Sequence, residues 1–244
     1  MPRPEVFSIR ALLREHVLLR DLPEAELDKL GTLAKVRSYD AGQTIFMKGD
    51  RARGMMVVLE GGVRIGASSP EGKEVVLNTI HPGEVFGEIA LIDGIERTAD
   101  AIAMEATELL ILDRKDFLPY LESNPNICIR MLQLMCKRIR TTSEQLEDFS
   151  FLDLRHRLAK RLGYLASTDY AETDGENKFV IKITQQDLAA MMGTTREAVN
   201  KQLRIMIDEG LIEQQRGAIV VNGPDKLESV LAEEKTSSTT GKFC

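Results

Sequence analysis

Glycine turns divide the segment from about residue 35 to residue 113 into short β-prone runs. Apolar runs such as Met55–Leu59 and Leu109–Leu112 are only a few residues long, and glycines such as Gly61 and Gly83 stand between them. Many short strands joined by glycine-containing turns are typical of a small antiparallel barrel or jelly roll. The segment is therefore predicted to fold as an antiparallel β domain, with helical patterns on both sides of it.

The stretch from Gly87 to Ala99 has the residues that a cyclic nucleotide requires. Glu88 stands nine residues before Arg97, with a glycine-containing loop between them. A carboxylate can accept a hydrogen bond from a ribose 2′-hydroxyl, and a guanidinium can donate two hydrogen bonds to a cyclic phosphate. Gly87 lets backbone N–H groups approach the phosphate, and the apolar run from Ile89 could form a helical turn whose N-terminus favours an anion. The alternative is an ordinary surface ion pair between Glu88 and Arg97.

Residues 125–149 predict a long helix with an apolar stripe at coiled-coil spacing. Such a seam predicts a parallel homodimer, although a helix packed on its own barrel needs a similar stripe. Thr142 places a hydroxyl at a core d position, where it costs stability unless something bonds to it. The a and d positions are occupied by Cys128, Leu132, Met135, Ile139, Thr142, Leu146 and Phe149.

A pair of short helices is predicted further along the chain. Thr184 and Asp187 come close to a capping box at the start of the first helix, and Gly193 permits a tight turn after it. Thr195 then caps a second helix over residues 196–209. Two helices joined in this way are typical of a helix-turn-helix, whose second helix enters the major groove of DNA.

The second helix of this pair carries polar side chains that suit base edges. Arginine and lysine suit guanine O6 and N7, and glutamate suits the cytosine amino group. An ordinary solvated face would also be charged, but it would not concentrate these residues in the first two turns after a glycine. Residues 211–221 then predict a winged hairpin with Gly217 in its turn, where Arg216 could touch a phosphate. The predicted buried stripe is Val199, Leu203, Met206 and Ile207, and the opposite face carries Arg196, Glu197, Asn200, Lys201 and Arg204.

Residues from about 25 to 223 resemble the bacterial transcription regulators of the cAMP receptor protein family. The 87–99 stretch also resembles the phosphate-binding cassette of eukaryotic cyclic-nucleotide-regulated kinases and channels. The resemblance implies an α+β fold, with an N-terminal antiparallel β jelly-roll sensor domain, a long dimerisation helix and a C-terminal winged helix-turn-helix domain. The implied bounds are 1–124, 125–150 and 151–232, and residues 233–244 are expected to be a disordered tail.

The resemblance also implies a ligand and its contacts. Matching threonine and serine residues of the long helix reach the purine in this family, one from each subunit. The implied function is a dimeric, cAMP-responsive regulator that binds palindromic DNA when a cyclic nucleotide fills the sensor. Thr98 also resembles cassettes that respond to cGMP, so a cGMP-responsive or ligand-independent regulator is the alternative. The predicted nucleotide site comprises Gly87, Glu88, Ile89, Arg97, Thr98, Thr142 and Ser143.

Relatives commonly carry Arg-Glu-x-x-x-Arg at the start of the recognition helix, whereas this chain has Lys201 in place of the final arginine. Because an ammonium does not reproduce the guanidinium fork, the base that Lys201 reads stays open. The expected partners are double-stranded DNA, a second copy of the chain and RNA polymerase. The predicted DNA-binding residues are Thr195, Arg196, Glu197, Asn200, Lys201, Arg204 and Arg216.

Composition argues against several other classes of protein. A chain of 244 residues with 43% apolar and 29% charged residues suits two soluble domains. It has no apolar run long enough for a membrane span and no signal-peptide core, so a cytoplasmic location without a membrane partner is expected. Cys128, Cys136 and Cys244 lack metal-ligand spacing, and the three histidines lie on different segments. Neither a metal nor an enzyme active site is expected.

The net charge of −6 does not by itself favour nucleic-acid binding. DNA affinity would have to come from a few placed contacts in a dimer rather than from a broad basic field. Basic residues nevertheless cluster locally at Lys137, Arg138, Arg140, Arg155, Arg157, Lys160 and Arg161.

Overall fold

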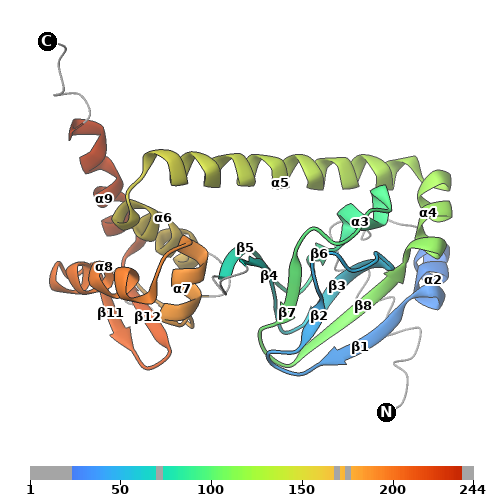
Figure 1. Cartoon of the computed structure of the whole chain (residues 1–244), viewed down its shortest axis with the longest axis horizontal. Coiled ribbons are helices and arrows are strands. Elements are labelled where there is room, and N and C mark those ends of the chain that lie inside the picture. The colour runs from blue at the N-terminus through green and yellow to red at the C-terminus, as the bar shows by residue number, and fades with distance from the viewer. Residues whose placement is uncertain (1–23, 70–73, 168–170, 174–176, 238–244) are drawn as a thin grey trace, which may run out of the picture. The chain divides into compact units, whose positions relative to one another are not determined.

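The computed structural model describes residues 24–69, 74–167, 171–173 and 177–237, in two compact units, Met1–Ile139 and Arg140–Cys244. The sequence predicts one or two short helices over residues 5–34; residues 24–33 are helical, and the part up to residue 23 lies outside the described residues. Both units combine helices with antiparallel sheets (Figure 1), which confirms the predicted α+β class. Within the described part of the chain, no helix is both long enough and apolar enough to cross a membrane.

Two four-stranded antiparallel sheets form the β domain of the first unit, as predicted. Their orders are β1-β8-β3-β6 and β2-β7-β4-β5, so strands far apart in sequence pair with each other. Lys35, for example, lies opposite Ile111. The strands are β1 (Lys35–Tyr39), β2 (Thr44–Phe46), β3 (Gly54–Glu60), β4 (Val63–Ser68), β5 (Glu74–Ile80), β6 (Val85–Phe86), β7 (Asp100–Ala103) and β8 (Thr107–Asp113).

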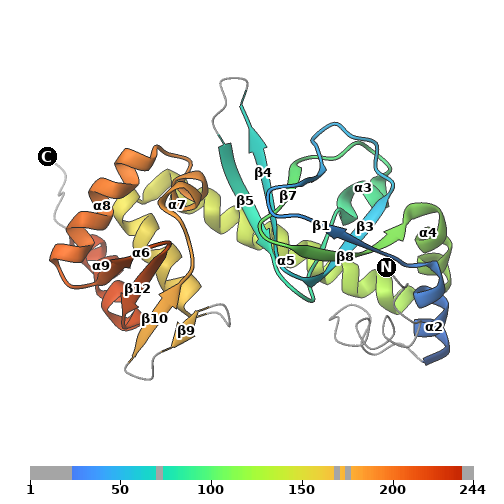
Figure 2. The same ribbon diagram turned by 90° about the horizontal axis from the view of Figure 1, so that it is seen from below.

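Strand β3 of the β1-β8-β3-β6 sheet is buried on both faces, which explains its unbroken apolar run. Met56 and Val58 of β3 face the second sheet, while Met55 and Val57 face the helices. The helices of this unit are α2 (Glu24–Leu33), the short α3 (Glu88–Asp93), α4 (Arg114–Ser123) and the first part of α5 (Pro125–Phe151), as Figure 2 shows from below. The helical side of the core contains Leu27, Leu30, Phe117, Leu121, Ile127 and Met131.

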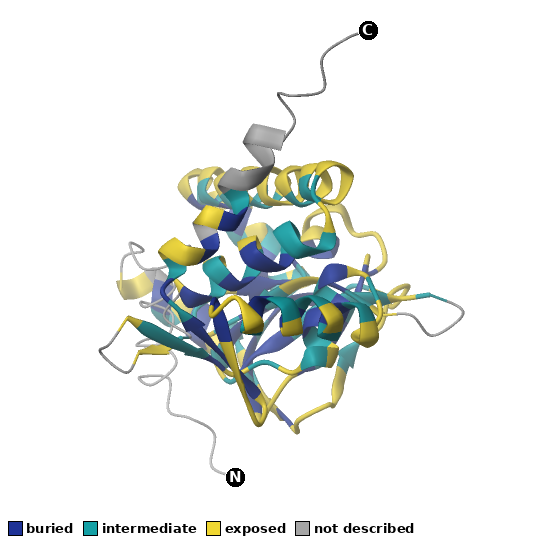
Figure 3. Cartoon of the chain, turned by 90° about the vertical axis from the view of Figure 1, so that its left-hand side faces the viewer, coloured by how far each residue is buried: buried dark blue, intermediate teal, exposed yellow. Residues whose placement is uncertain are grey.

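The second unit packs four further helices against a small sheet of order β11-β12-β10-β9. Its core is one cluster that joins Leu158 and Leu162 to residues such as Val199, Leu203 and Val221. Figure 3 colours the helices and strands by burial, with buried positions in dark blue. The helices are α6 (Leu154–Ala166), α7 (Gln185–Met192), α8 (Arg196–Asp208) and α9 (Pro224–Ser237), and the strands are β9 (Glu172–Thr173), β10 (Lys178–Ile181), β11 (Ile212–Gln215) and β12 (Ala218–Asn222).

Two predicted segments of the second unit differ from the structure. Residues 167–178 are polar and turn-rich, which predicts a loop between a helix and a strand, but Glu172–Thr173 pairs with β10 as an edge strand. Residues 233–244 were expected to be a disordered tail, but α9 continues to Ser237, and residues 238–244 lie outside the described part. Leu227 and Val230 are buried against the core, and this packing anchors a helix that local composition did not predict.

The local capping predictions are confirmed. The sequence predicts Asp153 as the N-cap of a helix from Leu154 to Ala166, and its side chain accepts a hydrogen bond from the backbone N–H of His156 at 3.0 Å. Thr184 and Asp187 form both halves of the capping box. Gly193 has φ +60°, in the left-handed region that a residue after a helix often requires. Asp153 therefore fixes the start of α6, the capping box fixes the start of α7, and Gly193 ends α7 before the turn to α8.

Candidate functional site

Gly87 and Arg97 meet at the start of α3 because the loop after this helix folds back on it. The Nη1 group of Arg97 donates to the Gly87 carbonyl at 2.8 Å, and Nη2 donates to the Gly54 carbonyl at 2.7 Å. Gly87 has φ +77°, and a Cβ added there would stand 2.5 Å from Arg97 Nη1. The missing side chain of Gly87 therefore leaves room for the Arg97 guanidinium, and the approach of backbone N–H groups to a phosphate at Gly87 stays a prediction.

The Arg97 guanidinium lies inside the unit rather than in solvent. The residue is 5% exposed, and its guanidinium carbon is 4.2 Å from the centroid of the Phe46 ring. Burial lowers the pKa of Arg97, and the charges of Glu88 and Asp50 oppose that shift. An arginine pKa stays far above neutrality, so the site holds a permanent cation. Among the described residues its hydrogen bonds go to backbone carbonyls and not to a carboxylate.

Glu88 is a buried carboxylate with one occupied and one unoccupied oxygen. It is the first residue of α3 and is 1% exposed. Its Oε1 accepts a hydrogen bond from the guanidinium of Arg138, a residue of α5, which also donates to the Val85 carbonyl. Its Oε2 is buried and has no hydrogen-bond partner within the described part of the chain. A buried acceptor without a donor is costly, so this oxygen is suited to a donor from a ligand.

Arg138 is the residue of this site that sequence reasoning missed. The sequence grouped it with basic residues available to DNA, because it stands beside Lys137 and Arg140. In the structure it bonds to Glu88, which stands 50 positions earlier in the sequence. The Arg155 guanidinium similarly bonds both oxygens of Glu209, at 2.9 and 2.8 Å. The basic cluster is therefore partly engaged in internal contacts and is a weaker DNA signal than predicted.

The remaining predicted ligand residues are exposed. Ile89 and Thr98 belong to the first unit and are exposed. Thr142 and Ser143 are exposed on α5 and belong to the second unit. Their approach to a nucleotide therefore stays a prediction. Among the described residues there is no group of three His, Cys, Asp or Glu side chains that could hold a metal ion.

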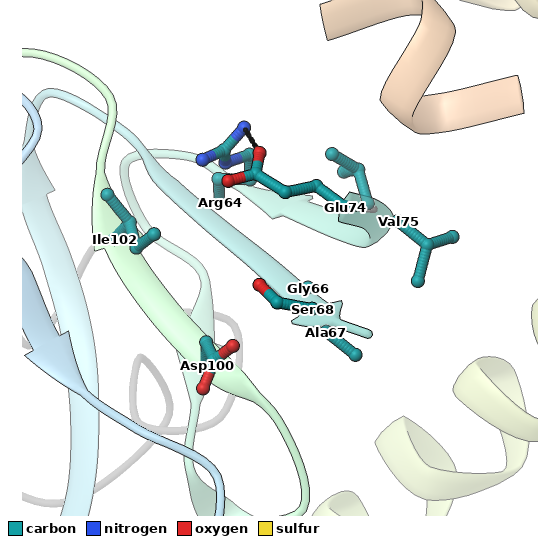
Figure 4. A pocket seen from close by; sticks show the side chains of 9 residues that line it. Arg64, Gly66, Ala67, Ser68, Glu74, Val75, Asp100 and Ile102 are labelled. Carbon is teal, nitrogen blue, oxygen red and sulfur yellow. Dashed lines mark ion pairs between the residues drawn. The ribbon is translucent and has the colours of Figure 1, made fainter. Parts of the chain in front are cut away.

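A separate hollow lies over β4, β5 and β7 (Figure 4), and it is not the predicted nucleotide site. It is lined by Arg64, Gly66 and neighbouring residues, and the Arg64 guanidinium pairs with Glu74 at 3.1 Å. Val63 and Ile65 of the same strand point into the core, so the hollow lies on the opposite face of the sheet. Neither Glu88 nor Arg97 lines it.

The second helix of the helix-turn-helix presents most of its predicted polar face to solvent. Arg196, Glu197, Lys201 and Arg204 are exposed on α8, as are Thr195 at its N-cap and Arg216 in the β11–β12 turn. Asn200 differs from the prediction. It is half-buried, and its Oδ1 is buried with no hydrogen-bond partner in the described residues. It lies at the edge of the buried stripe because it follows Val199 and precedes Leu203 by three residues.

Two of the exposed side chains are held by their neighbours. The Nε of Arg196 donates to Oε1 of Gln185, the first residue of α7, at 3.3 Å. Hydrogen bonds from its own backbone N–H and from the Thr195 side chain lower the pKa of Glu197. This carboxylate lies in the first turn of α8, and Gln185 bonds the Arg196 guanidinium through its Nε.

The predicted seam of α5 is exposed along most of its length. Leu132, Ile139, Leu146 and Phe149 are large apolar side chains that face solvent in the single chain. Ile127 and Met131 lie on a different face of α5 and are buried against the β domain. One stripe of α5 thus packs on its own unit, and a second apolar stripe remains uncovered, which is the arrangement that a helix pair requires.

The comparisons with known families agree with the two units. Residues 36–124 match the cyclic nucleotide-binding domain family, and residues 156–230 match the Crp-like helix-turn-helix domain family. A cyclic nucleotide-binding domain followed by a helix-turn-helix defines the class of protein. The chain is a transcription regulator with a sensor domain and a DNA-binding domain, and it is not an enzyme.

Similar proteins narrow this class to one family. The cyclic AMP receptor protein of Thermus thermophilus is 32% identical over 213 residues, which cover 87% of this chain and 95% of that protein. The cAMP-activated global transcriptional regulator CRP of Salmonella typhimurium is 32% identical over 189 residues, 77% of this chain and 90% of that protein. The chain therefore belongs to the CRP family of bacterial transcription regulators, as its sequence motifs predicted.

Solved structures agree with this assignment. A CRP/FNR-family transcriptional regulator from Thermus thermophilus superposes with a TM-score of 0.69 at 29% identity, over 80% of this chain and 97% of that chain. The c-di-GMP responsive global regulator CLP of Xanthomonas campestris gives a TM-score of 0.73 at 23% identity, over 82% of this chain and all of that chain. At this identity the second likeness supports the fold alone.

Proposed function

We propose that the protein is a homodimeric transcription regulator that binds cAMP in its first unit and then binds a palindromic DNA site through α8. The observation that carries the ligand assignment is the pair of buried groups at the start of α3. Arg97 is a buried cation without a carboxylate bonded to it in the described structure, and Glu88 keeps one buried oxygen without a donor. A cyclic phosphate and a ribose hydroxyl supply the missing anion and the missing donor.

Each residue of the proposed site has a role. Arg97 and Thr98 would bind the cyclic phosphate, and Glu88 would accept a hydrogen bond from the ribose 2′-hydroxyl. Ile89 would lie next to Glu88 on α3. Arg138 would hold the Glu88 carboxylate in position through the hydrogen bond to Oε1. Thr142 from one subunit and Ser143 from the other would bind the base, so that the complete site requires a dimer.

The exposed stripe of α5 supports the dimer, and the exposed face of α8 supports DNA binding. Two recognition helices must lie about 34 Å apart to read half-sites one helical turn apart. The nucleotide would act by binding more tightly to the dimer arrangement that has this spacing. Inverting a 1:99 mixture of two arrangements requires about 5.5 kcal/mol of differential binding free energy. Contact with RNA polymerase is proposed on the family relationship alone.

The preference for cAMP rests on relatives whose names include cAMP, and Thr98 keeps cGMP as the second candidate. Isothermal titration of the purified protein with cAMP, cGMP and c-di-GMP separates the candidates. We expect cAMP to bind most tightly and to increase the affinity for a palindromic TGTGA-type DNA in a mobility-shift assay. Tighter binding of another nucleotide, or full DNA affinity without any nucleotide, contradicts the proposal.

Arg97→Gln tests the site itself. We expect this variant to lose nucleotide binding and nucleotide-dependent DNA binding while it remains a dimer in solution. Arg37→Gln is the matched control, because Arg37 is an exposed arginine on β1 of the same unit. An Arg97→Gln protein that still responds to cAMP like the control would show that the site has been assigned wrongly.

A further inference from the structure

An aromatic ring joins the end of α5 to the helix-turn-helix of the same unit. The guanidinium carbon of Arg157, in α6, stands 4.3 Å from the centroid of the Phe149 ring, in the last turns of α5. On another side, the ring edge reaches the turn between α7 and α8. A Cβ added to Gly193 would stand only 3.3 Å from Cζ of Phe149. The ring therefore occupies the space beside a glycine that leads directly into the recognition helix.

Arg157 has few other partners that could hold it in this position. Its Nη1 donates to the carbonyl of Met192, the last residue of α7, at 3.2 Å. Its Nε is buried and has no hydrogen-bond partner in the described residues. The carboxylate of Asp148, the residue before Phe149, binds the Lys160 ammonium at 2.6 Å. The face of the Phe149 ring is thus a principal partner of this cation, and a desolvated cation–π contact is among the stronger ones.

Phe149 also stands at a d position of the predicted dimer seam, and 49% of it is exposed. A residue that only filled a seam would need no cation against its face, and a residue that only held the turn would need no apolar exposure. The same side chain can therefore contact a second α5 on one side and the helix-turn-helix on the other. No other seam residue in the described part of α5 has contacts with both Arg157 and Gly193.

We propose that Phe149, Arg157 and Gly193 form an aromatic clamp, which positions the turn before α8 on the last turns of α5. Through this clamp, a change in the pairing of two α5 helices moves the recognition helix α8. Without the clamp, the change would not be transmitted past the turn near Asp153 that separates α5 from α6. The nature of the signal rests on the proposed function, but the holding of the turn does not. Phe149 and Arg157 are positioning residues and need not touch either DNA or nucleotide.

The first test measures the turn in the protein without nucleotide. Phe149→Leu keeps an apolar seam residue but removes the aromatic face, and Arg157→Lys keeps the charge but removes the planar guanidinium. The backbone N–H groups of Gly193 and Thr194 bond to the carbonyls of Ala190 and Ala189 at 3.3 and 3.0 Å. We expect hydrogen exchange at these two amides to quicken by about tenfold or more in each variant. Unchanged exchange overturns the proposal.

Leu146→Ala is the matched control for the seam. Leu146 is the seam residue that precedes Phe149 on α5; it is exposed and is not one of the clamp residues. We expect this variant to weaken the dimer, as measured by analytical ultracentrifugation, while exchange at Gly193 and Thr194 stays within twofold of the unchanged protein. Exchange that quickens as much in Leu146→Ala as in Phe149→Leu would mean that the dimer, and not the clamp, holds the turn, and would overturn the proposal.

The second test measures the signal. The coupling factor is the ratio of the DNA dissociation constants measured without and with saturating cAMP, at concentrations where every variant is dimeric. We expect Phe149→Leu and Arg157→Lys each to lower this factor at least about fivefold while the cAMP dissociation constant stays within about twofold. The double variant should be no worse than the stronger single variant, because both changes break one contact.

The outcomes separate this inference from the proposed function. A coupling factor that is unchanged in both single variants, or losses that add in the double variant, overturns the clamp while the proposed function stands. A parent protein that binds DNA but responds to no cyclic nucleotide overturns the proposed function. In that case the exchange rates at Gly193 and Thr194 alone decide whether the clamp holds the turn.

Discussion

Replacing Arg138 with alanine should destabilise the first unit more than the replacement of any other solvent-exposed residue of α5 with alanine. Arg138 is 27% exposed at its side chain, whereas the carboxylate of Glu88 is 1% exposed. Arg138→Ala therefore leaves a buried charge without its hydrogen-bonded cation. Removing one partner of a buried ion pair costs about 3–5 kcal/mol. Since Arg138 is partly hydrated, we expect the lower end, about 3 kcal/mol of opening free energy.

Native-state hydrogen exchange measures this change where it occurs. Val57 and Leu110 lie opposite each other in the centre of the β1-β8-β3-β6 sheet. Exchange of their amides through opening of the unit should become faster by about two powers of ten, since each power corresponds to about 1.4 kcal/mol. Arg140→Ala is the control, because Arg140 is exposed two positions further along the same helix. It should change the opening free energy by less than about 0.5 kcal/mol.

A double variant tests the physical reason. Glu88→Gln together with Arg138→Ala removes the charge as well as its partner, so the buried group that remains is neutral. The double variant should be less destabilised than Arg138→Ala alone, by about 1–2 kcal/mol. A loss below about 1 kcal/mol in Arg138→Ala, or purely additive effects in the double variant, would refute the view that this carboxylate depends on one cation.

Three further predictions concern other parts of the chain. Gly87→Ala should displace the Arg97 guanidinium, because the added Cβ would stand 2.5 Å from its Nη1 and the backbone has φ +77°. We expect a loss of about 1–3 kcal/mol in stability together with weaker nucleotide binding by titration calorimetry. Gln185→Ala should lower the ratio of specific to non-specific DNA affinity several-fold in a competition mobility shift, because the first arginine of α8 loses the acceptor at 3.3 Å that orients it. An unchanged ratio would show that this arginine needs no orientation. Burial acts to raise the pKa of Asp153, but hydrogen bonds from the neighbouring histidine outweigh it, and the net pKa is lowered. Its contribution to stability is therefore present above the unfolded-state pKa of about 3.9 and is lost as the pH falls through the lower folded-state value. Thermal melts at decreasing pH should show a smaller loss for Asp153→Asn than for the unchanged protein, and equal losses would contradict this assignment.

The local features of the fold could be predicted from the sequence because their causes lie within a few residues. The Thr184–Asp187 capping box, the turn at Gly193 and the start of α6 at Asp153 each depend on one short stretch. The order of cassette, long helix and helix-turn-helix was also readable, because residue type and spacing carry it. These features placed the chain in its family before any tertiary contact was known.

The contacts missed from the sequence are those that tertiary packing creates. Arg138 stands in a basic stretch of α5, and only the packing of that helix on the β domain brings it to Glu88. The Arg97 guanidinium occupies the space beside Gly87, a contact that depends on how the loop after α3 folds and that the local sequence does not show. Phe149 fits a heptad, and nothing in the heptad indicates that Arg157 covers its ring. α9 was missed for the same reason, since Leu227 and Val230 are stabilised by a distant core.

The pairing of β1 with β8 has a consequence for synthesis on the ribosome. Lys35 of β1 can pair with Ile111 of β8 only after both have been synthesised, and the same core also contains Met131 from α5. Closing contacts so distant in sequence is slow, because the chain entropy of the whole intervening loop is lost first. More than half of the polypeptide must leave the exit tunnel before the N-terminal core can close, so its unpaired apolar strands are exposed to chaperones and to aggregation during translation.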